Sequence, residues 1–268
     1  MMRTRTSADL PGFARRLRES AECLWGTWVK LPSLETVEMI AMAGFDFIVI
    51  DQEHSPLSLE SAYRTTVVAQ GLGLHVIVRV PDRSESHLQR LLDLGVDGIQ
   101  VPRVQNADEV RRLVSQMVFS PEGDRGLGST ARAGGWGERS RAEYVAHGNE
   151  NVLRAVQLED MSALEQVEEI VAVPELNGVF LGAGDLSLSS GLSPSDPRID
   201  ALVDRMLRAA EARGIPCGAA VQTPEQASRA ADRGFQYVMV SNDASIFREA
   251  AAALGHQLHR QTVGAAHG

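Results

Sequence analysis

Short apolar runs recur along the chain, and segments with a different period separate them. The runs are rich in β-branched residues and contain few polar positions, as expected for strands that are covered on both faces. They lie at 25–29, 47–50, 76–80, 98–102, 153–158, 178–182, 216–221 and 237–241. The pattern therefore predicts eight parallel strands.

The intervening segments have the period of amphipathic helices. Apolar residues recur at spacings of three and four in 34–44, 86–95, 107–117 and 201–214, which gives each helix one apolar face. A further helix is expected over 9–21. Eight βα units without a linker predict one domain over 1–268, a (β/α)₈ TIM barrel with an additional N-terminal helix. An open, doubly wound sheet is the alternative, because periodicity does not show whether the strands close.

One connection is longer than the others. Residues 119–150, between the fourth and fifth strands, are rich in Gly, Ser and Arg. Long loops in compact domains are often functional, and the chemistry of such barrels lies at the C-terminal ends of the strands. We therefore expect the fourth strand to deliver this segment to that face.

The net charge and the cysteine content of the chain exclude several classes of ligand. With 26 basic and 35 acidic residues the 268-residue chain has a net charge of −9, which opposes binding to nucleic acid or to an anionic membrane. Cys23 and Cys217 are the only cysteines, so a disulfide framework or a cysteine zinc site is excluded. No signal peptide and no apolar run of membrane-spanning length is present. A cytoplasmic protein with small-molecule ligands is expected.

Two carboxylates stand at equivalent ends of neighbouring predicted strands. Glu159 follows the fifth strand and Asp185 follows the sixth, one βα repeat later. Two carboxylates and water suit a hard divalent ion such as Mg²⁺ or Mn²⁺. The alternative for Asp185 is a helix N-cap.

An arginine and a histidine lie at the same predicted face. Arg79 occupies an otherwise apolar strand, and a buried arginine must meet an anion, either a ligand or a protein carboxylate. His54 is the only histidine at a predicted strand end on this face and is a candidate general acid or base. Most single histidines have structural roles instead. Gly182 and Gly184 precede a helix and leave N–H groups that could face an anion.

These residues occur in stretches that resemble the HpcH/HpaI family of class II pyruvate aldolases. The similarity extends over nearly the whole chain. The matching stretches are GTW (26–28), AGFDFIVIDQEHSP (43–56), VIVRVP (76–81), LLDLGVDGIQVPRVQNADE (91–109), FSPEGDRGLG (119–128), RAVQLED (154–160) and GVFLGAGDLSLSSG (178–191).

The resemblance implies a reaction and a set of site residues. A 4-hydroxy-2-oxo acid would be cleaved reversibly to pyruvate and an aldehyde through an enolate. The resemblance implies a divalent cation (Mg²⁺, Mn²⁺ or Co²⁺) on Glu159 and Asp185, His54 as acid and base, and Arg79 beside the keto oxygen. The expected substrate-binding residues are Trp28, Gln157, Ala183, Gly184 and Asp185.

The resemblance also bears on assembly. Family members commonly form hexamers of subunits that exchange the last helix, which would place residues 243–260 on a neighbour. Asp93 matches a family aspartate associated with the catalytic histidine. Because Asp93 ends a predicted helix, away from its own strand ends, such a role would have to cross a subunit boundary.

Two departures from the family pattern concern the site. Gly182-Ala183-Gly184-Asp185 replaces the common Gly-Pro-Ala-Asp, which makes the turn more flexible. Arg103 stands where a methionine is common, and it could alter the aldehyde pocket or recruit an acidic substrate.

Three other mechanisms or functions are weighed against the metal-dependent aldolase. A CoA-ester lyase of the malyl-CoA or citryl-CoA type would use the arginines of 119–150 as a nucleotide groove, and a non-catalytic barrel would only bind an oxo acid. A Schiff-base aldolase would need Lys30, the only lysine. We expect Lys30 to be solvated or paired with Glu35 or Glu38, and therefore too basic to be a nucleophile.

Overall fold

Eight parallel strands close into a barrel in chain order. The computed structural model describes residues 12–193 and 196–265. The first and last strands pair with each other, with Gly26 opposite Met239, so the barrel prediction is confirmed and the open sheet is excluded. The strands are β1 (Leu24–Val29), β2 (Phe47–Asp51), β3 (His75–Arg79), β4 (Gly98–Val101), β5 (Leu153–Leu158), β6 (Gly178–Leu181), β7 (Cys217–Val221) and β8 (Tyr237–Asn242).

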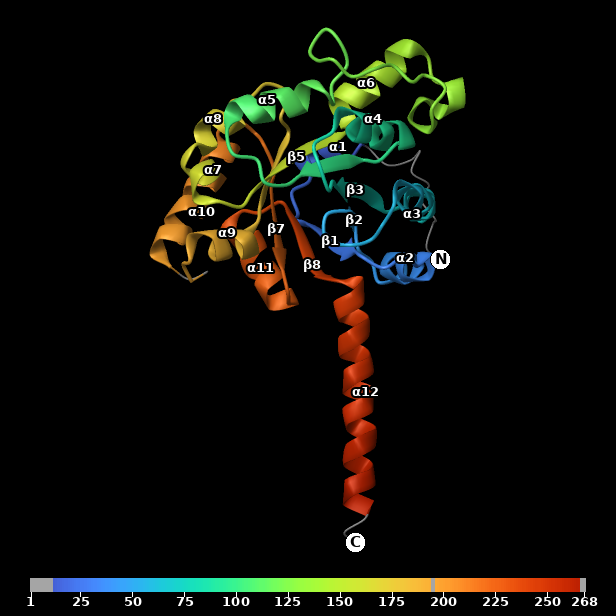
Figure 1. Cartoon of the computed structure of the whole chain (residues 1–268), viewed down its shortest axis with the longest axis vertical. Helices are drawn as coiled ribbons and strands as arrows, with labels where there is room; N and C mark the ends of the chain where they lie inside the picture. The colour runs from blue at the N-terminus through green and yellow to red at the C-terminus, as the bar shows by residue number, and fades with distance from the viewer. Residues whose placement is uncertain (1–11, 194–195, 266–268) are drawn as a thin grey trace.

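Helices surround the barrel in the predicted alternation (Figure 1). Gly95 ends the fourth helix with a φ of 77°, a conformation that glycine adopts without a Cβ clash. The helices are α1 (Phe13–Glu19), α2 (Leu34–Met42), α3 (Leu59–Gly71), α4 (Glu85–Leu94), α5 (Ala107–Ser115), η2 (Arg132–Gly137), α6 (Arg141–Asn151), α7 (Met161–Glu165), α8 (Val167–Val171), α9 (Ala183–Ser190), α10 (Pro197–Glu211), α11 (Pro224–Arg233) and α12 (Asp243–Ala265).

The N-terminal helix closes one end of the barrel. Phe13 of α1 is fully buried, and its ring lies 5.2 Å from that of Phe47 and 6.5 Å from that of Tyr237. Both partners stand at the first residues of their strands, so α1 covers the N-terminal end of the barrel. The helix predicted over 9–21 is confirmed at 13–19, and residues 9–11 lie outside the described part. The C-terminal end of the barrel is therefore the face at which a ligand can reach the strand ends.

The prediction for residues 119–150 is wrong in its location. This segment follows α5, which has already carried the chain back toward the N-terminal end of the barrel. Its helix α6 packs on α1, and η2 packs on α4. The fourth strand delivers only the short turn 102–106 to the C-terminal face. The arginines of 119–150 do not line a groove at that face, since Arg125 is buried against Phe119 and Tyr144.

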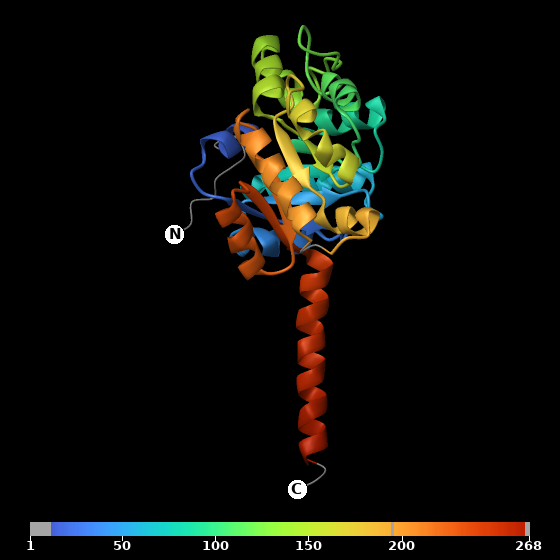
Figure 2. The same ribbon diagram turned by 90° about the vertical axis from the view of Figure 1, so that its left-hand side faces the viewer.

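The last helix extends away from the barrel. Figures 1 and 2 show α12 as a long arm that contacts the barrel only at its root. There the Asp243 carboxylate accepts hydrogen bonds from the amides of Lys30 and Leu31, both at 3.0 Å. Along the arm Phe247 is 71% and Leu254 is 64% exposed. Within the described ranges no helix is long and apolar enough to cross a membrane.

Candidate active site

Arg79 is held at the C-terminal end of β3 by a carboxylate on the neighbouring strand. Asp51 and Arg79 are register partners on β2 and β3. Arg79 donates from Nε to Asp51 Oδ1 at 3.0 Å and from Nη2 to Oδ2 at 2.9 Å, and both side chains are buried. This two-point geometry fixes the plane of the guanidinium. The internal salt bridge considered for Arg79 is therefore present.

Lys30 shares the same carboxylate. Its Nζ lies 2.8 Å from Asp51 Oδ2. The expected pairing with Glu35 or Glu38 is wrong, because the end of β1 directs Lys30 toward β2 and not toward α2. Burial alone would raise the pKa of Asp51, but the hydrogen bonds from Arg79 and Lys30 outweigh it and leave that pKa below its ordinary value.

Two further groups fix Arg79. Its Nη1 lies 3.2 Å from Glu53 Oε2, and its guanidinium carbon lies 4.3 Å from the centroid of a Trp28 ring. Trp28 is itself held edge-on against Phe180 in the barrel interior. The guanidinium is thus enclosed by two carboxylates and an aromatic face, which leaves its position little freedom.

His54 stands at the mouth, close to this cluster. Its backbone amide donates to Asp51 Oδ1 at 3.2 Å, and its Nε2 lies 3.6 Å from Glu53 Oε2. The imidazole is 47% exposed. The structure therefore brings His54 and Arg79 together around Glu53, with the imidazole open to a ligand.

Glu159 is ordered by a chain of buried amides. Gln100 donates to Gln157 at 2.6 Å, and Gln157 donates to Glu159 Oε2. A Cβ on Gly182 would lie 2.5 Å from the Cβ of Glu159 and 2.9 Å from its Oε2. Only glycine at 182 allows this carboxylate to occupy its place beside the end of β6.

Asp185 lies in the first turn of α9 and is exposed. The N-cap of this helix is Gly182, and no side chain caps it. The N-cap interpretation of Asp185 is therefore wrong, and its carboxylate is available for another role. Ala183 and Gly184 line a hollow of about 680 Å³ between β6, β7 and α11.

The electrostatics around Glu159 suit a cation. Burial raises the pKa of Glu159, and the charges of Asp185 and Glu53 raise it further, against the hydrogen bond from Gln157. Glu53 Oε2 contacts Arg79 Nη1 at 3.2 Å as an ion pair without hydrogen-bond geometry. A positive charge beside Glu159 and Asp185 would relieve this repulsion. Among the described residues no cluster of three or more His, Cys, Asp or Glu side chains could hold a metal, so two carboxylates plus water or ligand oxygens form the donor set that fits.

Asp93 does not join these residues. On α4 it accepts hydrogen bonds from Gln89 at 3.0 Å and from Tyr144 at 3.3 Å, and it lies 3.7 Å from Arg125. Within its own subunit Asp93 therefore ties α4 to the segment 119–150. A role at a neighbouring subunit's histidine stays a prediction.

Sequence reasoning missed several residues of the cluster. Asp51 and Glu53 lie in the stretch that contains His54, and the sequence predicts no role for either, although both side chains are shielded from solvent and bind arginine. Arg103 Nη2 lies 2.8 Å from Glu53 Oε1. The sequence shows that each of these residues lies at or just after the end of a strand. Which carboxylate pairs with which arginine depends on the register between strands.

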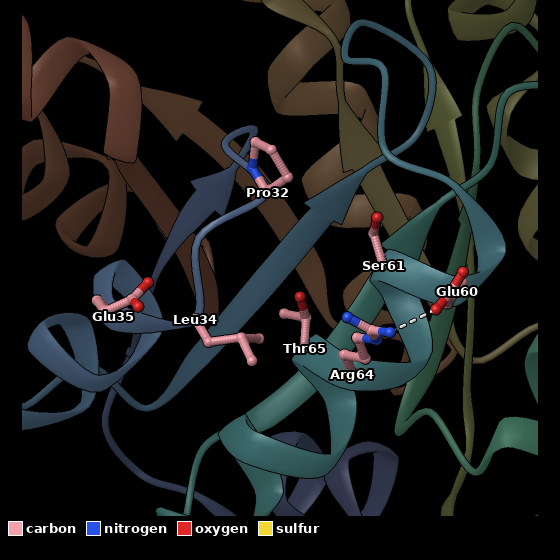
Figure 3. A pocket seen from close by; sticks show the side chains of 7 residues that line it. All are labelled: Pro32, Leu34, Glu35, Glu60, Ser61, Arg64 and Thr65. Carbon is pink, nitrogen blue, oxygen red and sulfur yellow. Dashed lines mark hydrogen bonds and ion pairs between the residues drawn. The ribbon is translucent and has the colours of Figure 1, made fainter.

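A second hollow lies outside this cluster. It has a volume of about 390 Å³ between α2 and α3. Figure 3 shows Leu34 and Thr65 facing one another across it, and Arg64 paired with Glu60 on the same helix at 2.6 Å. None of the predicted site residues lines it.

Comparison with known proteins decides the family. A family model described as HpcH/HpaI aldolase/citrate lyase matches residues 24–250. The chain belongs to this family. The 2-dehydro-3,6-dideoxy-6-sulfogluconate aldolase of Pseudomonas putida is 34% identical over 231 residues, covering 85% of this chain and 90% of its own. The 2-keto-3-deoxy-L-rhamnonate aldolase of Escherichia coli O1:K1 / APEC is 30% identical, covering 89% of each chain.

A solved structure agrees with the whole architecture. The HpcH/HpaI aldolase of Desulfitobacterium hafniense DCB-2 superposes with a TM-score of 0.87 at 27% identity, covering 93% of this chain and 97% of its own. The family match and the two aldolase relatives show that this chain is an enzyme, a carbon–carbon lyase of the aldolase type. The sequence-based prediction of family and reaction class is confirmed.

Proposed function

We propose that the enzyme is a divalent-metal-dependent aldolase that reversibly cleaves 4-hydroxy-2-oxo acids to pyruvate and an aldehyde. The observation that carries the proposal is the electrostatic interaction of Glu159 with Asp185 and with Glu53, the carboxylate that pairs with Arg79 at 3.2 Å. The two relatives are named as aldolases of deoxy-sugar acids, which supports a substrate of that kind.

Glu159 and Asp185 would hold the metal ion. When bound, a divalent ion supplies a Lewis acid that polarises the 2-oxo group and offsets negative charge on its oxygen. Gln157 keeps Glu159 in the geometry that accepts a cation by donating to Oε2.

Arg79 stabilises the enolate oxygen that develops during cleavage. Its guanidinium is oriented before the substrate arrives by Asp51, Glu53 and Trp28. Such a preorganised charge costs no reorganisation during the reaction, and this is usually the largest electrostatic contribution to catalysis.

His54 moves the proton. In cleavage its imidazole takes the proton of the C4 hydroxyl, directly or through a water. The electron pair of the C3–C4 bond then passes into the enolate, and C4 leaves as the aldehyde carbonyl. Protonation of the enolate carbon gives pyruvate. In the addition direction the same imidazole returns a proton to the new alkoxide, and a general acid–base group of this kind contributes about 10² to 10⁴ in rate.

A Schiff base at Lys30 is disfavoured by its ion pair. A lysine nucleophile must be free to attack the keto carbon, whereas Lys30 Nζ is held 2.8 Å from the buried carboxylate of Asp51. We expect no reduced pyruvyl adduct on Lys30 after treatment with pyruvate and borohydride.

The test of the proposal is pyruvate release from a series of 4-hydroxy-2-oxo acids with added Mg²⁺, Mn²⁺ or Co²⁺. Glu159→Gln and Asp185→Asn are each expected to reduce turnover by at least about 10²-fold with the fold retained, because one carboxylate leaves an incomplete site. The matched control is Glu168→Gln on α8, a carboxylate that pairs with Arg205 of α10 and with none of the candidate site residues. Full turnover after exhaustive chelation would refute the metal-dependent mechanism.

The exposed arm supports a proposal about assembly. We propose that α12 is exchanged between subunits of a homo-oligomer, a hexamer by analogy with the family. Its apolar residues Phe247 and Leu254 remain exposed in the isolated chain, and an exposed apolar helix face of this kind marks an interaction site.

A further inference from the structure

Arg103 projects over the mouth from a backbone conformation that arginine rarely adopts. It follows β4 with a φ of 57°, a left-handed conformation that is strained for a residue with a Cβ. Its side chain is 66% exposed, so burial of apolar surface does not offset that strain. The turn places the guanidinium where it reaches Glu53.

A second arginine holds this turn in place. Arg83 donates from Nη2 to the carbonyl of Pro102 at 3.1 Å and to the carbonyl of Arg103, and its Nη1 pairs with Glu109. The loops after β3 and β4 thus carry a fixed cationic rim beside Glu53 and Glu159.

Glu53 does not depend on Arg103 for an ion-pair partner. Glu53 also contacts Arg79 at 3.2 Å, so departure of Arg103 leaves that buried carboxylate paired. The Arg103 guanidinium is well exposed and is hydrated when it leaves Glu53. Arg103 can therefore exchange Glu53 for an incoming anion at little cost.

We propose that Arg103 binds an anionic group at the far end of the aldehyde portion of the substrate, a carboxylate, sulfonate or phosphate. The inference rests on the proposed function and adds that the substrate is acidic at both ends. Glu53 lies between Arg79, which serves the pyruvate portion, and Arg103, which approaches from the open side. The guanidinium fork matches planar or tetrahedral oxyanions.

The test compares two aldehydes in the addition to pyruvate, succinic semialdehyde and the neutral pentanal. A carboxylate oxygen of the first corresponds to the terminal methyl group of the second, so the two chains have the same length in non-hydrogen atoms. Arg103→Met should lower the ratio of their kcat/KM values, anionic over neutral, by about 10- to 100-fold, mainly through KM. Arg103→Lys should give an intermediate ratio, because it keeps the charge and loses the fork. Arg111→Met on α5 removes an arginine of similar exposure, 59% against 66%, that pairs with Asp108 on its own helix, and it should leave the ratio unchanged.

An unchanged ratio, or an equal loss with both aldehydes, would overturn the proposal, since Arg103 would then not recognise the end charge. Exchange of the pyruvate methyl hydrogens in D₂O with metal separates this result from the proposed function, because it requires no aldehyde. If exchange occurs but the enzyme does not prefer the anionic aldehyde, the role of Arg103 is refuted and the proposed function stands. Absence of exchange in the unmodified enzyme refutes the proposed function, and the inference falls with it.

Discussion

Gly182 determines how closely two neighbouring strand ends approach at the candidate metal site. The added Cβ of an alanine would overlap the Glu159 side chain. We expect Gly182→Ala to weaken Mn²⁺ binding by about 10- to 100-fold while the barrel stays folded, because displacement of a ligating carboxylate has effects of this size. Calorimetric titration with Mn²⁺ measures the affinity.

Gly184→Ala is the matched control for this substitution. A Cβ at Gly184 would meet nothing within 4 Å, so this variant should bind Mn²⁺ like the unmodified enzyme. Equal affinity of Gly182→Ala and the unmodified enzyme would show that Glu159 does not ligate the ion.

The raised pKa of Glu159 predicts how pH acts on the metal-free enzyme. The folded state holds this proton more tightly than the unfolded chain does. The contribution of Glu159 to the free energy of unfolding is therefore greatest at low pH, and it falls as pH rises from the ordinary glutamate value through the raised one. Denaturant titrations should show that the free energy of unfolding of the unmodified enzyme, relative to that of Glu159→Gln, decreases as pH rises. Saturating Mn²⁺ should reverse this trend, because the ion binds only the carboxylate.

At the scale of elements, the positions of the strands could be predicted from the sequence, whereas the structure of the connection between β4 and β5 could not. The apolar runs gave all eight strands to within a residue or two, because both faces of a parallel strand are buried. Helix α6 was missed because Gly148 interrupts its pattern. That glycine is needed where Phe119 packs, since a Cβ there would lie 2.6 Å from the ring. Its start was detectable, as Ser140 and Glu143 form a capping box.

The pairings at the mouth could not have been predicted in the same way. Asp51 meets Arg79 because β2 and β3 pair in a particular register, and Lys30 meets Asp51 because β1 pairs with β2 so that Val29 stands opposite Ile50. Residue type and position after a strand gave the face of the barrel on which these groups lie. Which carboxylate binds which cation depends on distances that periodicity does not contain.

The contact between α4 and the segment 119–150 depends on a buried cation. Arg125 lies 4.2 Å from the centroid of the Phe119 ring, 3.2 Å from Tyr144 Oη and 3.7 Å from Asp93. We expect Arg125→Met to lower the free energy of unfolding by about 1–3 kcal/mol, because two polar partners lose their donor. Denaturant titration measures the change. Arg141→Met, at the exposed start of α6, should stay within about 0.5 kcal/mol, and a similar loss in both variants would contradict this role.

At the scale of the whole molecule, the arm makes a prediction about assembly. Phe247 and Leu254 are seven residues apart and so lie on one face of α12. Phe247→Glu with Leu254→Glu should convert the oligomer to smaller species by light scattering, because charges replace the apolar contacts that an exchanged helix would make. Arg248→Glu, on another face, should keep the oligomer. A monomeric unmodified enzyme would disprove helix exchange.

The first residue of α12 contacts the segment that contains Lys30, the only lysine of the chain. Asp243 closes onto the amides of Lys30 and Leu31, while the Lys30 ammonium reaches Asp51 beneath Arg79. A protease that cuts only after lysine therefore has a single bond to attack, between Lys30 and Leu31, and the Asp243 carboxylate binds the N–H of that peptide bond and the N–H of Lys30 before it. Nicking at that bond reports release of the arm, and an amine-reactive label on Lys30 reports on the charge cluster. Two simple chemical reactions thus monitor quaternary structure and active-site integrity in the unmodified protein.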